Sequence, residues 1–289
     1  MGNNSHYRIL RDKLIARHKD LQKNVWEKHR GALTHFIQNT KQLALGGVGT
    51  LALLTSPNMP LLPASTNTIN EVGIDIDKSM FLKADLGKLV PQEVRPLTAE
   101  EEQRVTAIIS RDLGIMVKAE IEGKRLDRSY GYIGAEQHLA RYPGDSMGSH
   151  FQNASDASEF YSSGMAPGLG AWGYFVGANE TLTQKYGERE KYYIAVQTFL
   201  SKDFQTKFAE YRDFYKFRKM LLVNVDNGRA IVTVIGDAGP ASWTGKHLGG
   251  SPEVMRYLER VDGRQRGPVL YFFVEDPEDK IPLGPVNNI

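Results

Sequence analysis

The sequence predicts an α+β protein, and three observations lead to this prediction. Two apolar runs flank the tripeptide Asp226-Asn227-Gly228, a strong hairpin turn because Asn and Gly tolerate positive φ. Residues 96–114 carry helix start and stop signals, ending at Gly114. The chain has 289 residues, of which 41% are hydrophobic and 24% are charged, a composition that supports a sizeable core.

The N-terminal region, residues 1–63, is first basic and then apolar. Residues 1–42 hold nine Lys and Arg against three acidic residues and are expected to form a basic helix. Residues 43–55 are apolar or small, which suits an export signal or a weak membrane anchor behind a positive segment. The alternative is a soluble basic helix followed by a buried glycine-rich segment. The first interpretation predicts an exported cell-envelope protein that contacts the membrane here, with a linker at 64–78.

The composition excludes several classes of function. The chain contains no Cys, so disulfides, thiolate catalysis and Cys-zinc sites are excluded. The formal net charge of +2 gives no electrostatic reason to expect a nucleic-acid partner. The sequence has no glycine-rich phosphate loop, serine elbow or i, i+4 histidine pair. We therefore expect neither a cofactor nor a metal ion.

The middle segment, residues 79–200, is predicted to mix helices and strands. At the start of its clearest helix, Thr98 and Glu101 fit a capping box. Residues 116–126 alternate around a Glu-Gly turn and predict a hairpin, and residues 190–200 predict a strand.

One polar stretch of this segment is dense in groups with acid, base or ligand chemistry. It contains Glu136, His138, Arg141, Asp145 and His150. A buried Glu136 would have a raised pKa and could act as a general acid. Glu136 and His138, at i and i+2, would share one face of a strand and could bind a metal ion. The simpler interpretation is a hydrogen-bonded loop on the surface.

A glycine-rich and aromatic stretch follows at residues 162–175. Trp172 and Tyr174 could line a sugar-binding cleft, because aromatic faces and polar tips suit carbohydrate. Residues of this kind also serve as core, which is the alternative for both.

The C-terminal region, residues 201–289, is rich in predicted strands. Strands are expected at 220–225 and 229–235, on either side of the hairpin turn, and at 267–276. Between them, Ser251 precedes a proline at the first position of a short helix.

The stretch "VIGDAGPASWTGKHLGGSPEVMRYL" resembles the signature of double-psi β-barrel glycan-active proteins. Rare lipoprotein A-like wall proteins, expansin-like domains, the barrel of membrane-bound lytic transglycosylase A and fungal-type chitosanases share variants of it. In these, a strand ends in Asp-x-Gly-Pro and a Ser later opens a short helix. The matching positions are Asp237, Gly239, Pro240 and Ser251. The resemblance implies a six-stranded double-psi barrel over 201–289, with residues 79–200 packed on it.

The resemblance also implies a function on peptidoglycan or a related polysaccharide. In the lytic enzymes of this group the Asp is the general acid, a role that falls to Asp237. One carboxyl suffices for lytic cleavage, whereas hydrolysis needs a partner acid about 5–9.5 Å away. Glu136, Asp145 and Glu275 are candidates, and Glu136 is our choice as the second catalytic residue. The expected ligand-binding residues are Trp243, His247, Ser251, Trp172, Tyr174, His138 and Asp145.

The same residues also have simpler interpretations. Asp237 could cap the turn before Gly239, Trp243 could plug the barrel mouth, and His247 could face solvent. The chain would then be a non-catalytic cell-wall-binding protein or a structural and assembly protein that uses the same barrel.

Overall fold

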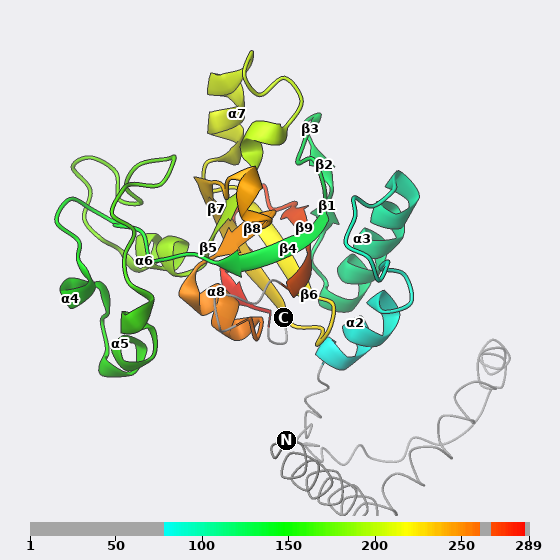
Figure 1. Ribbon diagram of the computed structural model, residues 1–289, viewed down its shortest axis with the longest axis horizontal. Coiled ribbons are helices and arrows are strands. Elements are labelled where there is room, and N and C mark those ends of the chain that lie inside the picture. Colours follow the sequence, from blue (N-terminus) through cyan, green and yellow to red (C-terminus); the bar gives the residue numbers. More distant parts are fainter. Residues whose placement is uncertain (1–77, 261–266, 287–289) are drawn as a thin grey trace, which may run out of the picture. The chain divides into compact units, whose positions relative to one another are not determined.

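The computed structural model describes residues 78–260 and 267–286. Within them, strands close into a barrel in the order β4, β8, β5, β7, β6 and β9, with β9 pairing back to β4 (Figure 1). Their bounds are β4 Tyr130–Ala135, β5 Tyr193–Val196, β6 Lys219–Asn224, β7 Ala230–Ala238, β8 Leu248–Gly250 and β9 Gly267–Val274. The pairs β4–β8 and β5–β7 are parallel, and the other four pairs are antiparallel. The structure confirms an α+β fold with a closed six-stranded barrel.

Short strands extend this barrel. β1 (Val117–Lys118) pairs with β9, and β10 (Gly284–Pro285) pairs with β7. The predicted hairpin is confirmed, since β2 (Glu120–Ile121) pairs antiparallel with β3 (Lys124–Arg125). The two residues of its turn, Glu122 and Gly123, both have positive φ, as a tight hairpin turn requires.

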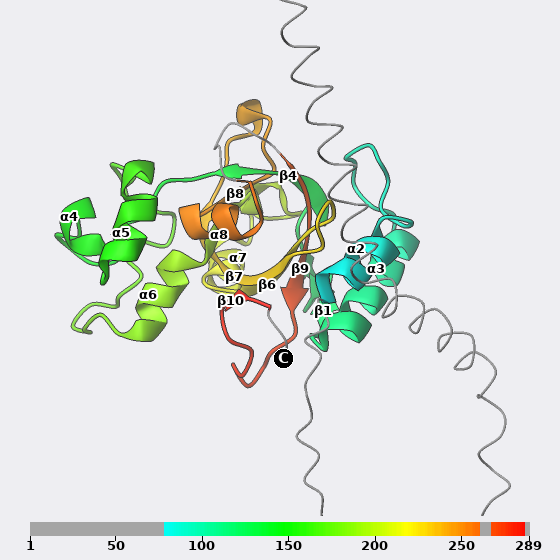
Figure 2. The same ribbon diagram turned by 90° about the horizontal axis from the view of Figure 1, so that it is seen from below.

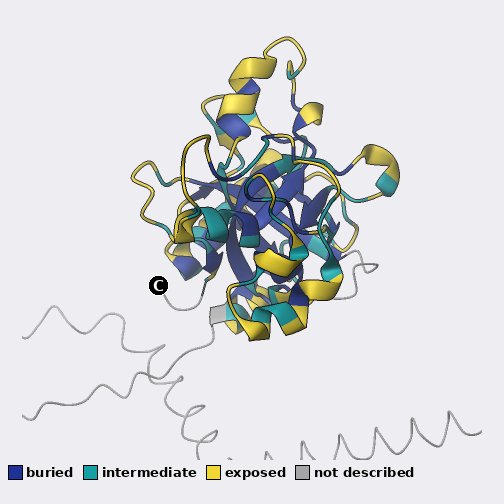
Figure 3. Ribbon diagram, turned by 90° about the vertical axis from the view of Figure 1, so that its left-hand side faces the viewer, coloured by how far each residue is buried: buried dark blue, intermediate teal, exposed yellow. Residues whose placement is uncertain are grey.

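Side chains of the central strands alternate between the barrel interior and an outer layer. On β9, Val269, Tyr271 and Phe273 lie in the interior, and Leu270, Phe272 and Val274 join an outer cluster with α2 (Lys78–Leu86) and α3 (Ala99–Leu113). Both faces of these strands are therefore buried, as the dark-blue centre of Figure 3 shows. Burial of both faces explains why the sequence of β9 is a continuous apolar run.

The helices lie in groups around the barrel. Figures 1 and 2 show α2 and α3 on one side, and α4 (Met147–His150), α5 (Ala154–Phe160) and α6 (Gln184–Lys191) on the opposite side. Helices α7 (Phe208–Tyr215) and α8 (Pro252–Tyr257) contribute buried residues to the interior cluster. Three single turns of 3-10 helix complete the set: η1 (Tyr161–Ser163), η2 (Thr198–Leu200) and η3 (Ser242–Thr244).

Several sequence predictions are confirmed in detail. Thr98 and Glu101 form the reciprocal capping box of α3, and Gly114 ends this helix in the left-handed conformation. The hairpin of β6 and β7 is present, and Ser251 caps α8.

Other predictions need correction. The barrel takes β4 and β5 from the middle segment, so it does not lie wholly within 201–289. The strand predicted at 190–200 is only Tyr193–Val196, because Glu190 belongs to α6 and Thr198 to a turn of 3-10 helix. The basic helix, the apolar segment 43–55 and nearly all of the linker lie outside the described residues. Among the residues described, no helix has the length and apolar character needed to cross a membrane.

Candidate functional site

A bulge in β7 places Asp237 on the outer face of the barrel. The register between β5 and β7 shifts so that Asp237 pairs with Ala195 and Gly236 is the extra residue. Ile235 and Ala238 pack against the interior cluster, whereas Ala195 is not part of it. Because paired residues share a face of the sheet, Asp237 lies outside with Ala195. Strict alternation after Ile235 would have turned its carboxyl inward, so the bulge redirects it.

Asp237 ends a row of very small residues that crosses four neighbouring strands. The row continues through Ala195, Gly249 and Gly134. Long side chains cover this backbone floor, Lys246 across Gly134 and Glu136 over Gly249, and a Cβ at either glycine would collide with them. Only glycine leaves room for these groups so close to the sheet.

The two side chains on the floor form an ion pair. Lys246 Nζ lies 3.0 Å from Glu136 Oε1 and donates a hydrogen bond of 3.0 Å to the carbonyl of Ala135. Both side chains keep partial exposure, 20% for Lys246 and 29% for Glu136, so they can move without disrupting the core. Gly249, which lies under Glu136, is two strands from Asp237, a backbone separation of about 9.6 Å at ~4.8 Å per strand.

The Asp237 carboxyl is held by backbone amides. Its Oδ1 accepts hydrogen bonds from the N–H groups of Ala171 (2.6 Å) and Ala238 (2.7 Å). Burial raises the pKa of Asp237 above its ordinary value, although these two hydrogen bonds act in the opposite direction. The carboxyl is therefore both a turn cap and a group with a greater tendency to carry a proton than a free Asp.

Trp243 and His247, expected as ligand contacts, have different environments. Trp243 is 88% exposed on η3, so the interpretation as a plug over the barrel mouth is wrong. His247 is half-buried over Gly131 and stacks on Tyr132, whose backbone N–H donates to its Nδ1 at 2.9 Å. It does not simply face solvent. Tyr174, two residues after Trp172, is half-buried.

Ser251 and Trp172 must be removed from the set of glycan contacts. Ser251 is fully buried, caps α8 through Val254 N–H and donates to the carbonyl of Lys191 at 2.7 Å. Trp172 is 9% exposed, joins the interior cluster and donates from Nε1 to the carbonyl of Ile235 at 3.1 Å. Both residues use their polar atoms within the fold.

His138 and Asp145 also differ from the expected surface loop. Both side chains are fully buried, and they lie in a cluster with Arg141, His150 and Glu190. Glu190 was missed because its helix gives no local signal of a site. The backbone of His138 is fixed separately by hydrogen bonds with Gly164 and Ala166 on a neighbouring loop.

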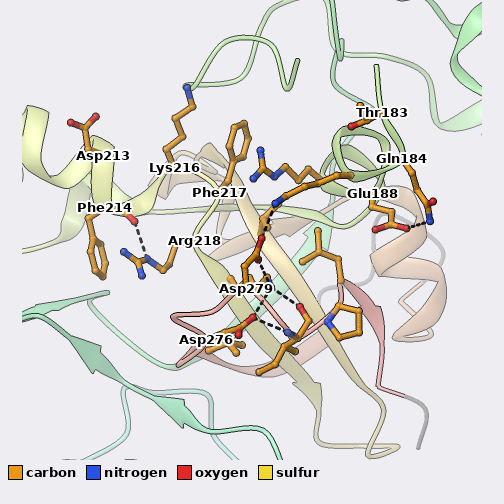
Figure 4. Close-up of a pocket in the computed structure, with 18 residues that line it drawn as sticks. Thr183, Gln184, Glu188, Asp213, Phe214, Lys216, Phe217, Arg218, Asp276 and Asp279 are labelled. Atoms are coloured by element: carbon orange, nitrogen blue, oxygen red, sulfur yellow. Dashed lines mark hydrogen bonds and ion pairs between the residues drawn. The ribbon is translucent and has the colours of Figure 1, made fainter. Parts of the chain in front are cut away.

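A cavity of about 620 Å³ lies away from Asp237, between α6, α7 and the segment after β9 (Figure 4). Four of the nine charged residues that line it pair with one another: Lys219 with Asp276 and Asp279 at 2.6 Å, and Lys185 with Asp279 at 2.7 Å. Arg189 lies over the ring of Phe217, 4.9 Å from its centre. These contacts give the charges concerned a structural role, and we place no catalytic residue there.

Comparison of the chain with protein-family models, curated proteins and solved structures gave no significant match. The fold and the site therefore define the protein only as an α+β protein with a closed six-stranded mixed barrel and a carboxyl group on its outer face.

Proposed function

We propose that this chain is an exported cell-envelope protein that cleaves peptidoglycan or a related glycan, with Asp237 as the general acid. The proposal includes a double-psi topology for the barrel and an export signal or membrane anchor at residues 43–55. The observation that carries it is the bulge that turns Asp237 outward, at the end of a floor made of glycine and alanine. The small residues of this floor let the Glu136 side chain lie close to the sheet on the same face as Asp237.

The pKa of Asp237 supports the acid role. Burial raises this pKa, and an acid with a raised pKa retains a proton to donate to the leaving glycosidic oxygen. Glu136 is the candidate partner, because it lies on the same face over Gly249, whose backbone is about 9.6 Å from that of Asp237. That separation is near the upper end of the ~6.5–9.5 Å range of inverting hydrolases and beyond the ~5–5.5 Å of retaining ones. If a water attacks, we therefore expect inversion at the anomeric carbon, with Glu136 as the base from its position over Gly249.

A non-catalytic wall-binding role is the second candidate, and the exposure of Trp243 favours it. A Trp that is 88% exposed offers a stacking face for a sugar without any chemistry. In this alternative, Asp237 only caps the turn through Ala171 and Ala238.

The test is turnover of purified peptidoglycan by the full chain and by Asp237→Asn. Asn keeps an oxygen acceptor for the two backbone amides but cannot donate an acidic proton. We expect muropeptide release by the wild type and a loss of about 10²–10⁴-fold in the variant, the range attributed to one general acid. Asp213→Asn, at an exposed carboxyl on α7, is the matched control and should leave the rate unchanged.

The products separate the remaining alternatives. Anhydro-sugar ends indicate lytic cleavage, and reducing ends of inverted configuration indicate hydrolysis with Glu136. No release, with both proteins sedimenting on intact sacculi, would replace the enzyme by the wall-binding protein.

A further inference from the structure

A buried carboxylate lies between two imidazoles, away from the floor that Asp237 borders. Glu190, near the C-terminal end of α6, places Oε1 3.3 Å from His138 Nδ1 and Oε2 3.0 Å from His150 Nε2. The exposed fractions of the three side chains are 0% for His138, 4% for His150 and 2% for Glu190. One donor atom from each of them lies within 4.8 Å of the others.

A second layer of hydrogen bonds orients these groups. The other ring nitrogen of His150, Nδ1, lies 3.3 Å from Asp145 Oδ2. Asp145 is fixed in turn by Arg141, whose Nε and Nη2 donate to its two oxygens at 2.7 and 2.9 Å. The backbone N–H of Leu139 donates to Glu190 Oε1 at 2.9 Å. A carboxylate behind a histidine is the arrangement that orients metal-binding imidazoles in proteins.

Two buried polar atoms beside the cluster have no hydrogen-bond partner. They are Nε2 of His138 and Oε2 of Glu253, the latter from the first turn of α8. Buried polar atoms without a partner are uncommon in folded proteins, and an ion or a water is one explanation for them. Glu253, His150 and Glu190 also line a cavity of about 370 Å³, which gives the cluster a route of access from outside.

We propose that His138, His150 and Glu190 bind a divalent transition-metal ion, with Zn²⁺ as the expected ion. Two imidazoles and one carboxylate form a donor set that suits zinc. Bonds of about 2.0–2.1 Å in a tetrahedral site separate donor atoms by about 3.4 Å. Each imidazole already lies near this distance from a carboxylate oxygen of Glu190, His138 Nδ1 at 3.3 Å from Oε1 and His150 Nε2 at 3.0 Å from Oε2. Because these are different oxygens, binding one ion requires the carboxylate as well as the two rings to shift toward it.

The charge of the cluster fits the same ion. Asp145 is paired with Arg141, whereas Glu190 has no Lys or Arg partner among the described residues and faces only the two imidazoles. Three protein ligands leave a fourth position, which we assign to a water or a small ligand that enters through the cavity beside Glu253. This site is independent of the glycan proposal and replaces our expectation that the chain binds no metal.

The competing explanation is a hydrogen-bond network in which Glu190 accepts a hydrogen bond from each histidine. Glu190→Gln separates the two, because Gln keeps the size and one acceptor oxygen but is a poor zinc ligand. The experiment strips the full chain with a chelator, titrates it with Zn²⁺, and measures bound metal by mass spectrometry and affinity by calorimetry. Four of the seven histidines precede the described residues, so the difference between wild type and variant is the quantity that matters.

We expect the wild type to bind one more zinc ion per chain than Glu190→Gln, with at least a 100-fold loss of affinity at this site. Asp145→Asn, which leaves the three ligands in place, should weaken binding about 10–100-fold. His247→Gln, outside the cluster, should have no effect.

Two further measurements distinguish a loss of metal binding from misfolding of the variant. Co²⁺ in a tetrahedral site gives an intense visible absorption, which the wild type and His247→Gln should show. Circular dichroism checks that Glu190→Gln is folded. Equal metal content and equal affinity in wild type and a folded Glu190→Gln would overturn the metal site and leave the hydrogen-bond network as the explanation.

Discussion

Gly249→Ala tests the candidate site with one methyl group. An added Cβ at this position collides with the Cγ of Glu136 as well as with its carboxylate, so the whole side chain, which is 29% exposed, must turn aside. The backbone is not in the left-handed region, so Ala is sterically allowed and loses less chain entropy on folding, a gain of about 0.4–1 kcal/mol. Loss of the partly exposed ion pair with Lys246 costs about 0–1 kcal/mol. The free energy of unfolding should therefore change by less than about 1 kcal/mol.

Activity should respond very differently from stability. The methyl expels the Glu136 carboxylate from the floor, so hydrolysis that uses Glu136 as a base should fall by about 10²–10⁴-fold, as with Glu136→Gln. Urea unfolding and peptidoglycan turnover measure the two effects on the same preparation. Gly187→Ala, on α6 with no atom near the new methyl, is the matched control. An active Gly249→Ala beside an inactive Glu136→Gln would refute this reasoning, and a loss of stability above about 3 kcal/mol would show that Glu136 cannot move aside.

Three further outcomes are expected. Ser251→Ala should lower the free energy of unfolding by about 1–2 kcal/mol, because it removes the α8 cap and a buried hydrogen bond to Lys191; a change below about 0.5 kcal/mol in urea denaturation would contradict this. Trp243→Ala should change stability by no more than about 0.5 kcal/mol, since this side chain is 88% exposed, yet weaken sedimentation on sacculi; unchanged binding would exclude it as a sugar platform. The raised pKa of Asp237 means that the folded state binds this proton more tightly than the unfolded state. The free energy of unfolding should then fall as pH rises from the unfolded pKa, about 3.9, through the folded value, and Asp237→Asn should lack this fall; parallel pH profiles of both proteins would contradict the shift.

The local elements of the fold follow from sequence where the signal is itself local. The capping box of Thr98 and Glu101, the turn after Asp226 and the cap at Ser251 each depend on residues a few positions apart. Their hydrogen bonds form within one turn, so the residue types at fixed spacing suffice to predict them.

The site depends on long-range pairing, which no local pattern reveals. Strand β8 is only Leu248–Gly250, and its two glycines gave no strand signal. Their neighbours explain why both residues are glycine. Glu136 lies against Gly249 on the outer face, and the α8 residues Val254 and Met255 lie against Gly250 on the inner face. The orientation of Asp237 likewise needs the bulge at Gly236, which exists only relative to β5.

The environment of polar residues was the hardest property to predict. His138 and Asp145 looked like parts of an exposed loop, yet their side chains are fully buried. Glu190, the partner of His138, lies 52 positions further along the chain. Only the packing of α4 and α6 beside the barrel brings these groups together.

One short segment links the two candidate sites. Glu136 and His138 are separated by a single residue at the end of β4, and both are held by backbone hydrogen bonds, Glu136 to Gly250 and His138 to Gly164 and Ala166. The imidazole of His138 is fixed from one side by Glu190, while the carboxylate of Glu136 extends over the floor that ends at Asp237. The segment that carries His138 into the buried cluster is therefore continuous with the backbone that carries Glu136, although each residue is held by its own backbone hydrogen bonds.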